Sequence, residues 1–250
     1  NNVDVSAATG RGIAVTNTPG VLTETTADLA WTLLMASARR ISESERYLRA
    51  GRWDSWGPQL FLGVDIHGKT LGIFGMGRIG QAVARRASGF GMRVIYTDAQ
   101  RLDPAAESEL KAEYVDKPTL LSESDFVSIH CPLLAETRHA FGAAEFRVMK
   151  KTAVLVNTSR GPVVDEAALA AALRSNEIFA AGLDVYENEP QVDVALLNCE
   201  NAVIIPHLGS ATRATRAKMA EMAATNIVAY FRGDVPPNCV NADALGNCSR

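Results

Sequence analysis

The chain has 250 residues, 47% of them hydrophobic and 21% charged, with a formal net charge of −3 at pH 7. These values are ordinary for a globular protein of one large domain, or of one domain and part of another. The slight negative charge argues against nucleic acid or an anionic membrane surface as the main partner. The four cysteines are scattered and form no C-x-x-C pair, which predicts neither a metal site nor a disulfide framework and favours the cytoplasm. No apolar run reaches the roughly 18 residues of a membrane span.

Residues 1–22 predict a short helix near residues 3–8 and a strand over 13–16, which the sequence Thr18-Pro19-Gly20 ends. Some twenty residues cannot bury a core of their own. Either they pack onto the rest of the chain, or they belong to a domain whose front part is missing. We favour the second interpretation.

Residues 23–50 predict one long helix, with Thr25 and Asp28 as a capping box at its start and Gly51 at its end. Its middle, LAWTLLMA, is apolar on every side. Such a helix is buried either between two domains or subunits, or in the centre of one core, and the pattern leaves both alternatives open.

A loop-like stretch after this helix contains Trp53, Trp56 and Phe61. Three aromatic side chains in a connection usually pack locally. They could also line a pocket or contact a neighbouring subunit.

The stretch Leu71–Arg86 reads as an apolar strand, a G-x-G-x-x-G turn and a helix, which is the context that the dinucleotide fingerprint requires. Gly75 permits the tight turn, Gly77 lets the backbone approach a pyrophosphate, and Gly80 lets the helix lie close to the strand. Glycines also mark ordinary loops. Here, however, a second strand follows and ends in Asp98, near the roughly 20-residue offset at which an acid meets the ribose hydroxyls. Dinucleotide binding is therefore predicted.

Further strands and helices alternate along the rest of the chain. Strands are predicted over 125–132, 153–159, 180–185 and 201–207, and helices over 165–174 and 212–232. Apolar strands alternating with helices predict a doubly wound parallel α/β sheet that is covered on both faces.

Polar residues follow these strands at the edge where ligands bind in such sheets. Arg160 can form two parallel hydrogen bonds with a carboxylate, His207 can donate a proton near neutral pH, and Glu189 can orient that donor. Each has an ordinary structural explanation when taken alone: a surface arginine, a structural histidine and a solvated loop. Together they provide what hydride transfer to a keto acid needs.

The motifs GMGRIG, NTSRGPVVDE, AAGLDVYENEP and PHLGSAT resemble those of the D-isomer-specific 2-hydroxyacid dehydrogenase family. TNTPGVLTETTADLAWTLLMASARR is similar to the interdomain helix of that family. DIHGKTLGIFGMGRIG, RGPVVDEAAL and the PPNCVN tail resemble most the branch that reduces glyoxylate, hydroxypyruvate and 2-ketogluconate.

The resemblance implies a role for each motif residue. Arg160 binds the substrate carboxylate, His207 is the acid-base catalyst with Glu189 as its partner, and no metal is required. The cofactor NAD, or NADP, is expected to contact Gly75, Met76, Gly77, Arg78, Ile79, Gly80, Asp98, Cys131, Pro132, Thr158, Ser159, Asp184, His207 and Gly209. Among these, Asp184 holds the nicotinamide carboxamide and Asp98 the adenosine ribose.

The resemblance also implies a Rossmann cofactor domain over 23–209, with 1–22 and 210–250 as parts of a flavodoxin-like substrate domain whose front part is missing. The implied reaction is reduction of a small 2-keto acid to a D-2-hydroxy acid by a cytoplasmic homodimer, without nucleic acid or membrane partners. One alternative is an NAD-sensing transcriptional corepressor of the same fold, and another is a non-catalytic cofactor-binding fragment. Asp98 predicts a preference for NAD, although Arg101 could bind the additional phosphate of NADP.

Overall fold

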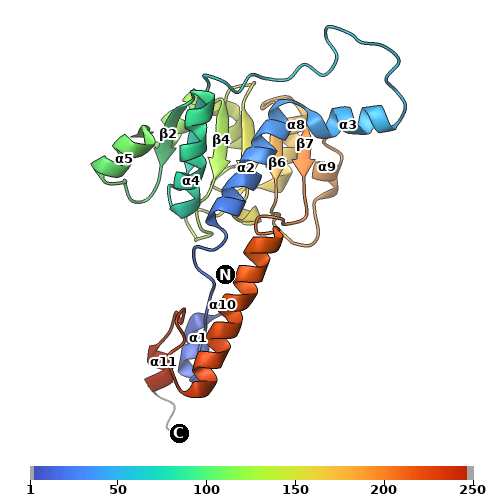
Figure 1. The fold of residues 1–250 in the computed structure, drawn as a ribbon. Coiled ribbons are helices and arrows are strands. Elements are labelled where there is room, and N and C mark those ends of the chain that lie inside the picture. The colour runs from blue at the N-terminus through green and yellow to red at the C-terminus, as the bar shows by residue number, and fades with distance from the viewer. Residues whose placement is uncertain (1–2, 247–250) are drawn as a thin grey trace. The chain divides into compact units, whose positions relative to one another are not determined.

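The structure is a computed structural model that describes residues 3–246. The chain divides into two compact units. The larger unit comprises residues 26–209, and the smaller unit combines residues up to 25 with those from 210 onward. Figure 1 shows the elements of both units.

The larger unit is built on a seven-stranded sheet with the order β3-β2-β1-β4-β5-β6-β7. All neighbouring strands are parallel. The strands are β1 (Thr70–Phe74), β2 (Arg93–Thr97), β3 (Ala112–Tyr114), β4 (Phe126–Ile129), β5 (Val154–Asn157), β6 (Ala180–Leu183) and β7 (Ala202–Ile204). The strand order reverses between β1 and β4, which is where dinucleotides bind in doubly wound sheets. The predicted fold class is confirmed.

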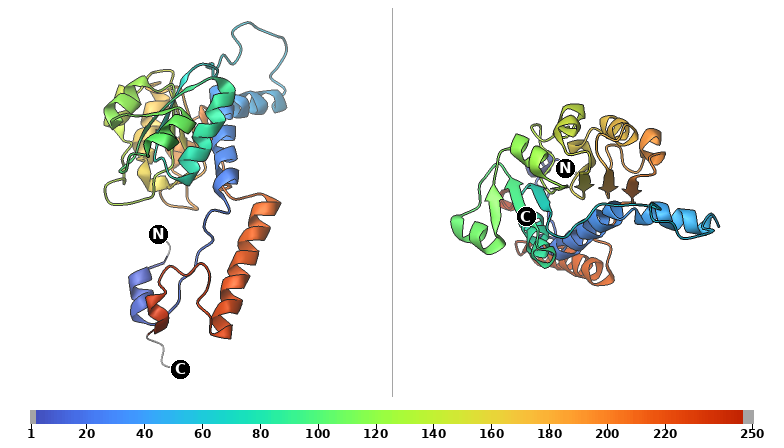
Figure 2. Two further views of the ribbon diagram at one scale, coloured as in Figure 1. Left: turned by 60° about the vertical axis from the view of Figure 1, so that its left-hand side comes forward. Right: turned by 90° about the horizontal axis from the view of Figure 1, so that it is seen from above.

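Helices cover both faces of this sheet. The helices of this unit are α2 (Thr23–Ala38), α3 (Ile41–Arg49), α4 (Arg78–Ala87), α5 (Pro104–Leu110), α6 (Lys117–Glu123), α7 (Ala143–Val148), α8 (Glu166–Arg174) and α9 (Val194–Leu197), with short 3-10 helices at Ser88–Phe90 and Gly161–Val163. Among them α3 has no buried residue and projects away from the sheet (Figure 1). One core lies between the sheet and α2 and α4, and the other lies between the sheet and α6 to α9. The view from above shows these two layers on opposite sides of the strands (Figure 2, right). Because β4, β5 and β6 are buried along their whole length, they are mainly apolar and do not alternate between polar and apolar residues.

The predicted long helix over 23–50 is wrong, because it is two helices. Arg40 adopts φ 52° between them, and its Nε and Nη2 atoms donate to the two carboxylate oxygens of Glu43. The backbone N–H of Val64 donates to the carbonyl of Ala38 at 2.9 Å, which satisfies the end of α2 from outside the helix. Neither Gly nor Pro marks this break in the sequence. The prediction of Gly51 near the helix end was better, since it follows α3 with φ 66°.

The capping box predicted for Thr25 and Asp28 is also absent. The hydroxyl of Thr25 lies 2.5 Å from that of Thr215, and Asp28 forms an ion pair with Arg86 at 2.6 Å. Leu33, further along α2, is buried against Gly182 of the sheet within one chain. This face of α2 is therefore packed in the core of its own chain.

The smaller unit contains α1 (Val5–Gly10), α10 (Arg213–Arg232) and α11 (Asp243–Gly246). The strand predicted over 13–16 is reduced to a single bridge between Thr16 and Cys239. The buried side chain of Asn241 instead holds this segment, accepting from the N–H of Val15 at 2.7 Å and donating to the carbonyl of Ile13 at 3.0 Å. None of the helices within the described part of the chain is long and apolar enough to cross a membrane.

Candidate active site

The glycine-rich turn after β1 packs directly on the end of β4. Gly75 adopts φ 99°, and a Cβ atom on it would lie 2.5 Å from the backbone nitrogen of Cys131. A Cβ on Gly80 would lie 2.2 Å from the carbonyl oxygen of Gly75. Neither position can carry a side chain, so the backbone of the turn is held tightly between β1, β4 and α4.

The next glycine leaves the start of α4 open. Gly77 is the N-cap of α4 and offers no side-chain acceptor, and a Cβ on it would meet nothing within 4 Å. The first N–H groups of a helix have no intrahelical partner, so those of Arg78 and Ile79 can receive an anion. The geometry suits a pyrophosphate that approaches the backbone over Gly77.

Two further observations fit a dinucleotide at this edge of the sheet. Asp98 follows β2, and its carboxylate accepts from the N–H of Met76 at 2.6 Å, which places it beside the turn. The hydroxyl of Thr158, just past β5, is buried without a hydrogen-bond partner among residues 3–246. An unsatisfied hydroxyl at a strand end is a candidate ligand contact. The residues present therefore fit the predicted cofactor.

The residues at the ends of β4 and β5 include a buried thiol, an exposed proline and an asparagine that holds the next loop. Burial raises the pKa of the Cys131 thiol to about 12, so it stays neutral and is not a nucleophile. Pro132, which follows it, is exposed. Asn157 accepts from the N–H and hydroxyl of Ser159 and donates to the carbonyl of Arg160 at 3.0 Å. Asn157 therefore fixes the loop that presents Arg160.

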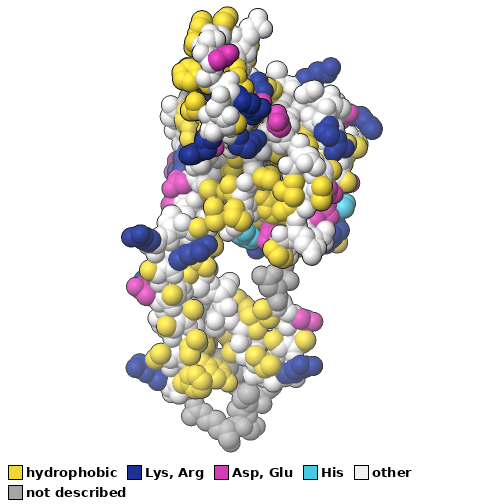
Figure 3. Space-filling model, turned by 90° about the vertical axis from the view of Figure 1, so that its right-hand side faces the viewer, with side chains coloured by type: hydrophobic (Ala, Val, Ile, Leu, Met, Phe, Trp, Pro, Cys, Tyr) yellow, Lys and Arg dark blue, Asp and Glu magenta, His cyan; other side chains and the backbone are white. Residues whose placement is uncertain are grey.

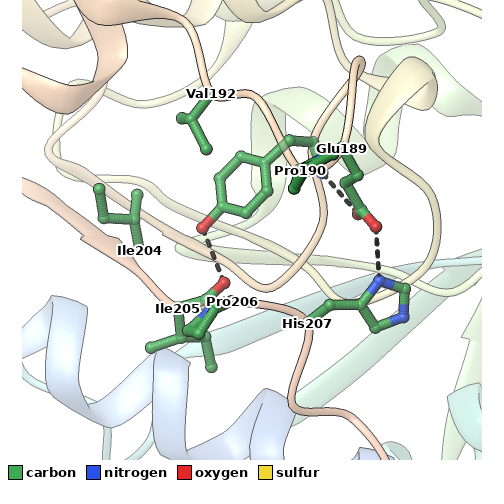
Figure 4. Close-up of a pocket in the computed structure, with 8 residues that line it drawn as sticks. Glu189, Pro190, Val192, Ile204, Ile205, Pro206 and His207 are labelled. Carbon is green, nitrogen blue, oxygen red and sulfur yellow. Dashed lines mark hydrogen bonds and ion pairs between the residues drawn. The ribbon is translucent and has the colours of Figure 1, made fainter.

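His207 and Glu189 form a pair on the loops that follow β7 and β6. The Nδ1 atom of His207 lies 2.7 Å from Oε2 of Glu189, and the other carboxylate oxygen accepts from the N–H of Tyr186 at 3.0 Å. Figure 4 shows the two side chains facing each other beside Pro190. Because a carboxylate only accepts, Nδ1 carries the proton, and Nε2 is left for a substrate.

A buried aspartate holds the histidine loop in an unusual conformation. His207 adopts φ 51°, a left-handed conformation that is uncommon outside glycine. Asp184, only 1% exposed at the end of β6, accepts from the N–H groups of Leu208 and Gly209 directly after it. Burial raises the pKa of Asp184, and these two N–H groups oppose that rise. Asp184 thus anchors the catalytic loop, a role that the sequence analysis did not assign to it.

Arg160 lies at the same edge of the sheet but apart from this pair. It is exposed just after β5, and its guanidinium donates to the carbonyl of Ser159 at 2.7 Å. Within the described part of the chain it forms no hydrogen bond or ion pair with His207 or Glu189. An arginine that binds a substrate carboxylate has to stay free of protein carboxylates, and Arg160 meets this condition.

A model of the "D-isomer specific 2-hydroxyacid dehydrogenase, NAD binding domain" family matches residues 31–209. The chain belongs to this family. A glyoxylate reductase of Korarchaeum cryptofilum is 57% identical over 98% of this chain and 74% of its own length. A glyoxylate/hydroxypyruvate reductase B of Salmonella newport is 52% identical over 98% of this chain and 76% of its own. The crystal structure of an NADPH-dependent glyoxylate/hydroxypyruvate reductase of Sinorhizobium meliloti, in complex with NADP and malonate, has a TM-score of 0.88 and 38% identity, and it covers 98% of this chain and 75% of that one.

These comparisons confirm an NAD(P)-dependent D-2-hydroxyacid dehydrogenase, and they confirm the resemblance to the glyoxylate and hydroxypyruvate reductases. The relatives named are enzymes, so the corepressor alternative gains no support from them.

Beside the histidine pair of this dehydrogenase lies a cavity of about 300 Å³. Its walls are largely apolar and include Pro190, Val192 and Ile204, and Figure 4 shows Val192 and Ile204 on the side away from the imidazole. Tyr186 closes its base by donating to the carbonyl of Ile205 at 2.8 Å. The hydroxyl and the N–H of Tyr186 therefore connect the two loops that carry Glu189 and His207, and no sequence pattern predicted this link.

The geometry of the pair predicts the effect of the Glu189→Gln variant on the rate. The carboxylate stabilises the imidazolium that donates the proton, and glutamine removes that negative charge. We therefore expect Glu189→Gln to lower kcat by at least about tenfold. Steady-state kinetics of both proteins measure the loss.

The matched control is Glu187→Gln. Glu187 lies in the same loop as Glu189, but its carboxylate pairs with His139 at 3.1 Å and not with His207. This control should keep the wild-type kcat. Equal kcat values for wild type and Glu189→Gln would contradict the proposed partnership.

Proposed function

We propose that the chain reduces glyoxylate or hydroxypyruvate to the corresponding D-2-hydroxy acid, with NADH as the preferred cofactor. The observation that carries this proposal is the His207–Glu189 pair at 2.7 Å, on the same sheet edge as the glycine-rich turn. The relatives that reduce these two keto acids support the choice of substrate.

In this mechanism the bound nicotinamide supplies the hydride for the keto carbon. Glu189 holds the proton on Nδ1 of His207, so the second proton of the imidazolium lies on Nε2 and is donated to the carbonyl oxygen. Glu189 also stabilises the charged ring before the transfer. Arg160 binds the substrate carboxylate through its planar guanidinium and so orients the keto group toward His207.

The remaining assignments follow from the same geometry. We assign the cofactor to residues 26–209 and the substrate domain to the smaller unit. The proposed cofactor contacts are Gly75, Met76, Gly77, Arg78, Ile79, Gly80, Asp98, Cys131, Pro132, Thr158, Ser159, Asp184, His207 and Gly209. For Asp184 we propose both the anchoring of the loop and a contact with the carboxamide. We place the enzyme in the cytoplasm, in keeping with the free thiols of Cys131, Cys199 and Cys239.

A kinetic panel tests the proposal. Oxidation of NADH and of NADPH is followed with glyoxylate, hydroxypyruvate, pyruvate and 2-ketogluconate. We expect the highest kcat/KM with glyoxylate or hydroxypyruvate and NADH. Higher values with pyruvate or 2-ketogluconate would reject the substrate assignment, and absence of oxidation with every keto acid would reject catalysis by this chain.

Asp98 predicts the choice between the two cofactors. Its carboxylate lies where it can accept ribose hydroxyls, and it would repel a 2′-phosphate a few ångströms away. We expect kcat/KM to favour NADH over NADPH by about tenfold, and Asp98→Ser to narrow or reverse this ratio. Glu109→Gln, which removes an exposed carboxylate from α5, should leave the ratio unchanged. A wild-type preference for NADPH would contradict the assignment of Asp98.

We propose a homodimer in which the segment after α3 contacts the partner. This segment projects from the larger unit, and Trp53 and Trp56 on it are 55% and 78% exposed, together with Leu62. Figure 3 shows the hydrophobic side chains gathered on this projection at the top of the view. Exposed tryptophans are typical anchors of protein interfaces, and Trp56 could reach the partner's substrate pocket.

Light scattering tests this proposal. We expect the mass of a dimer, and we expect Trp56→Ala to weaken dimerisation by about 30-fold, the usual effect of removing a central aromatic anchor. Phe231→Ala, which removes an exposed aromatic side chain of the smaller unit, is the matched control. A wild-type monomer at all concentrations would contradict the proposal.

A further inference from the structure

The corner of the sheet next to Asp98 contains an arginine that is already engaged. Asp98 accepts from the N–H of Met76 at 2.6 Å and from that of Gln100 at 3.1 Å, so the loop after β2 folds around its carboxylate. Arg101 comes directly after this turn. A cation at this place in a doubly wound fold is positioned to meet the 2′-phosphate of NADP.

The guanidinium of Arg101 is held by α5 instead. Its Nε and Nη2 atoms donate to the two carboxylate oxygens of Glu107 at 2.8 and 2.9 Å. The hydroxyl of Tyr96 donates to the same carboxylate at 2.7 Å and accepts from the N–H of Leu102. Arg101 is 64% exposed in this pair, whereas Glu107 is only 12% exposed, so the carboxylate is the fixed member and the arginine the mobile one.

Tyr114 places this pair next to the ribose carboxylate. The guanidinium of Arg101 lies 5.6 Å from the centre of the Tyr114 ring, and the hydroxyl of that ring donates to the carbonyl of Asp98 at 3.4 Å. Arg101 and Asp98 therefore border the same small region. A long arginine side chain can cross such a region by rotating about its own bonds.

We propose that Glu107 is a specificity-determining positioning residue, which favours NAD by holding Arg101 away from the place of a 2′-phosphate. This inference rests on the proposed cofactor site. At that site, Asp98 repels the 2′-phosphate. Glu107 holds Arg101, the cation of the adjacent loop, away from the position where it could offset this repulsion.

The protonation state of Glu107 keeps this restraint in place at physiological pH. The Arg101 guanidinium, together with the Tyr96 hydroxyl, lowers the pKa of Glu107 to about 2. The carboxylate is therefore ionised wherever the enzyme is expected to work. A phosphate must compete with the Glu107 carboxylate for this guanidinium, because the same pair of N–H donors cannot bind two anions at once.

Binding of two adenosine fragments tests the inference without catalysis. Adenosine 5′-monophosphate and adenosine 2′,5′-bisphosphate differ only in the 2′-phosphate, and calorimetry on the whole chain gives both dissociation constants. Glu107→Gln should strengthen binding of the bisphosphate by about three- to fivefold, the range for releasing an exposed ion pair, and leave binding of the monophosphate unchanged. A merely structural role of Glu107 would change both constants together.

A double-mutant cycle separates the release of Arg101 from a simple change of charge. The gain from Glu107→Gln should disappear in the Arg101→Ala background, and Arg101→Ala alone should have little effect. Glu109→Gln removes an exposed carboxylate from the same helix and should produce no gain. Glu107→Asp keeps the negative charge, but its shorter side chain moves the carboxylate away from the guanidinium of Arg101. This variant should therefore produce part of the gain in bisphosphate binding, and it provides the test if Glu107→Gln fails to fold.

Two outcomes would overturn the inference. An equal gain in the presence and absence of Arg101 would show that net charge alone acts. A several-fold loss of bisphosphate binding in Arg101→Ala would show that Arg101 already serves the phosphate. If the wild-type chain bound neither fragment, the cofactor site itself would be rejected, and the inference with it. If it bound the monophosphate normally and Glu107→Gln gave no gain, only the inference would fail.

Discussion

Arg160→Lys is expected to lower kcat/KM for the keto acid about 100-fold while leaving NADH binding nearly unchanged. Lysine keeps the positive charge but loses the planar pair of donors that matches a carboxylate. Hydrogen bonds to charged groups are worth about 1.5–3 kcal/mol, and about 2.7 kcal/mol corresponds to a 100-fold change in rate. Because Arg160 is exposed and bound only to the carbonyl of Ser159, the loop that carries it should not collapse in the variant.

Steady-state kinetics with glyoxylate and fluorescence titration with NADH measure the two quantities. Arg174→Lys is the matched control, because Arg174 is exposed at the end of α8, at the opposite edge of the sheet from Arg160. It should retain wild-type values for both. Near-normal kcat/KM in Arg160→Lys would remove Arg160 from the substrate site.

The central strands could be predicted because the signals for them lie within their own short stretches of sequence. The buried strands β4, β5 and β6 are mainly apolar runs, and Gly75, Gly77 and Gly80 mark the turn into α4. The edge strand β3 was not predicted, since it has only the three residues Ala112–Tyr114 and two of them are exposed. Nor could the break between α2 and α3 be predicted, because a contact from the distant Val64 stabilises it.

The sequence proposes residues for the site, but most contacts among them depend on the fold. Glu189 and His207 lie on loops after different strands, and nothing in their spacing fixes a hydrogen bond between them. Asp184 was predicted only as a residue that holds the nicotinamide carboxamide. Its anchoring of the histidine loop became visible only with the positions of the Leu208 and Gly209 N–H groups. Such roles depend on the orientation of backbone donors, which sequence patterns do not encode.

Gly161→Ala is expected to destabilise the enzyme more than any other substitution considered, because Gly161 lies against the backbone that follows β6. A Cβ atom at this position would lie 1.8 Å from the carbonyl carbon of Tyr186 and 2.5 Å from the nitrogen of Glu187. Both atoms belong to the main chain, so no side chain can rotate to make room. The loops that carry Arg160 and Glu189 must therefore separate. We expect a loss of about 3 kcal/mol or more in the free energy of unfolding.

For a chain of this size, such a loss lowers the melting temperature by about 10 °C. Calorimetry measures it, and Gly89→Ala is the control, because a Cβ on Gly89 would meet nothing within 4 Å. Activity should fall with stability, since the displaced backbone carries the carboxylate partner of His207 and adjoins the arginine of the substrate site. If Gly161→Ala had the same melting temperature as the wild type, these two loops would not pack against each other as described. Other contacts would then have to set the spacing between Arg160 and the histidine pair.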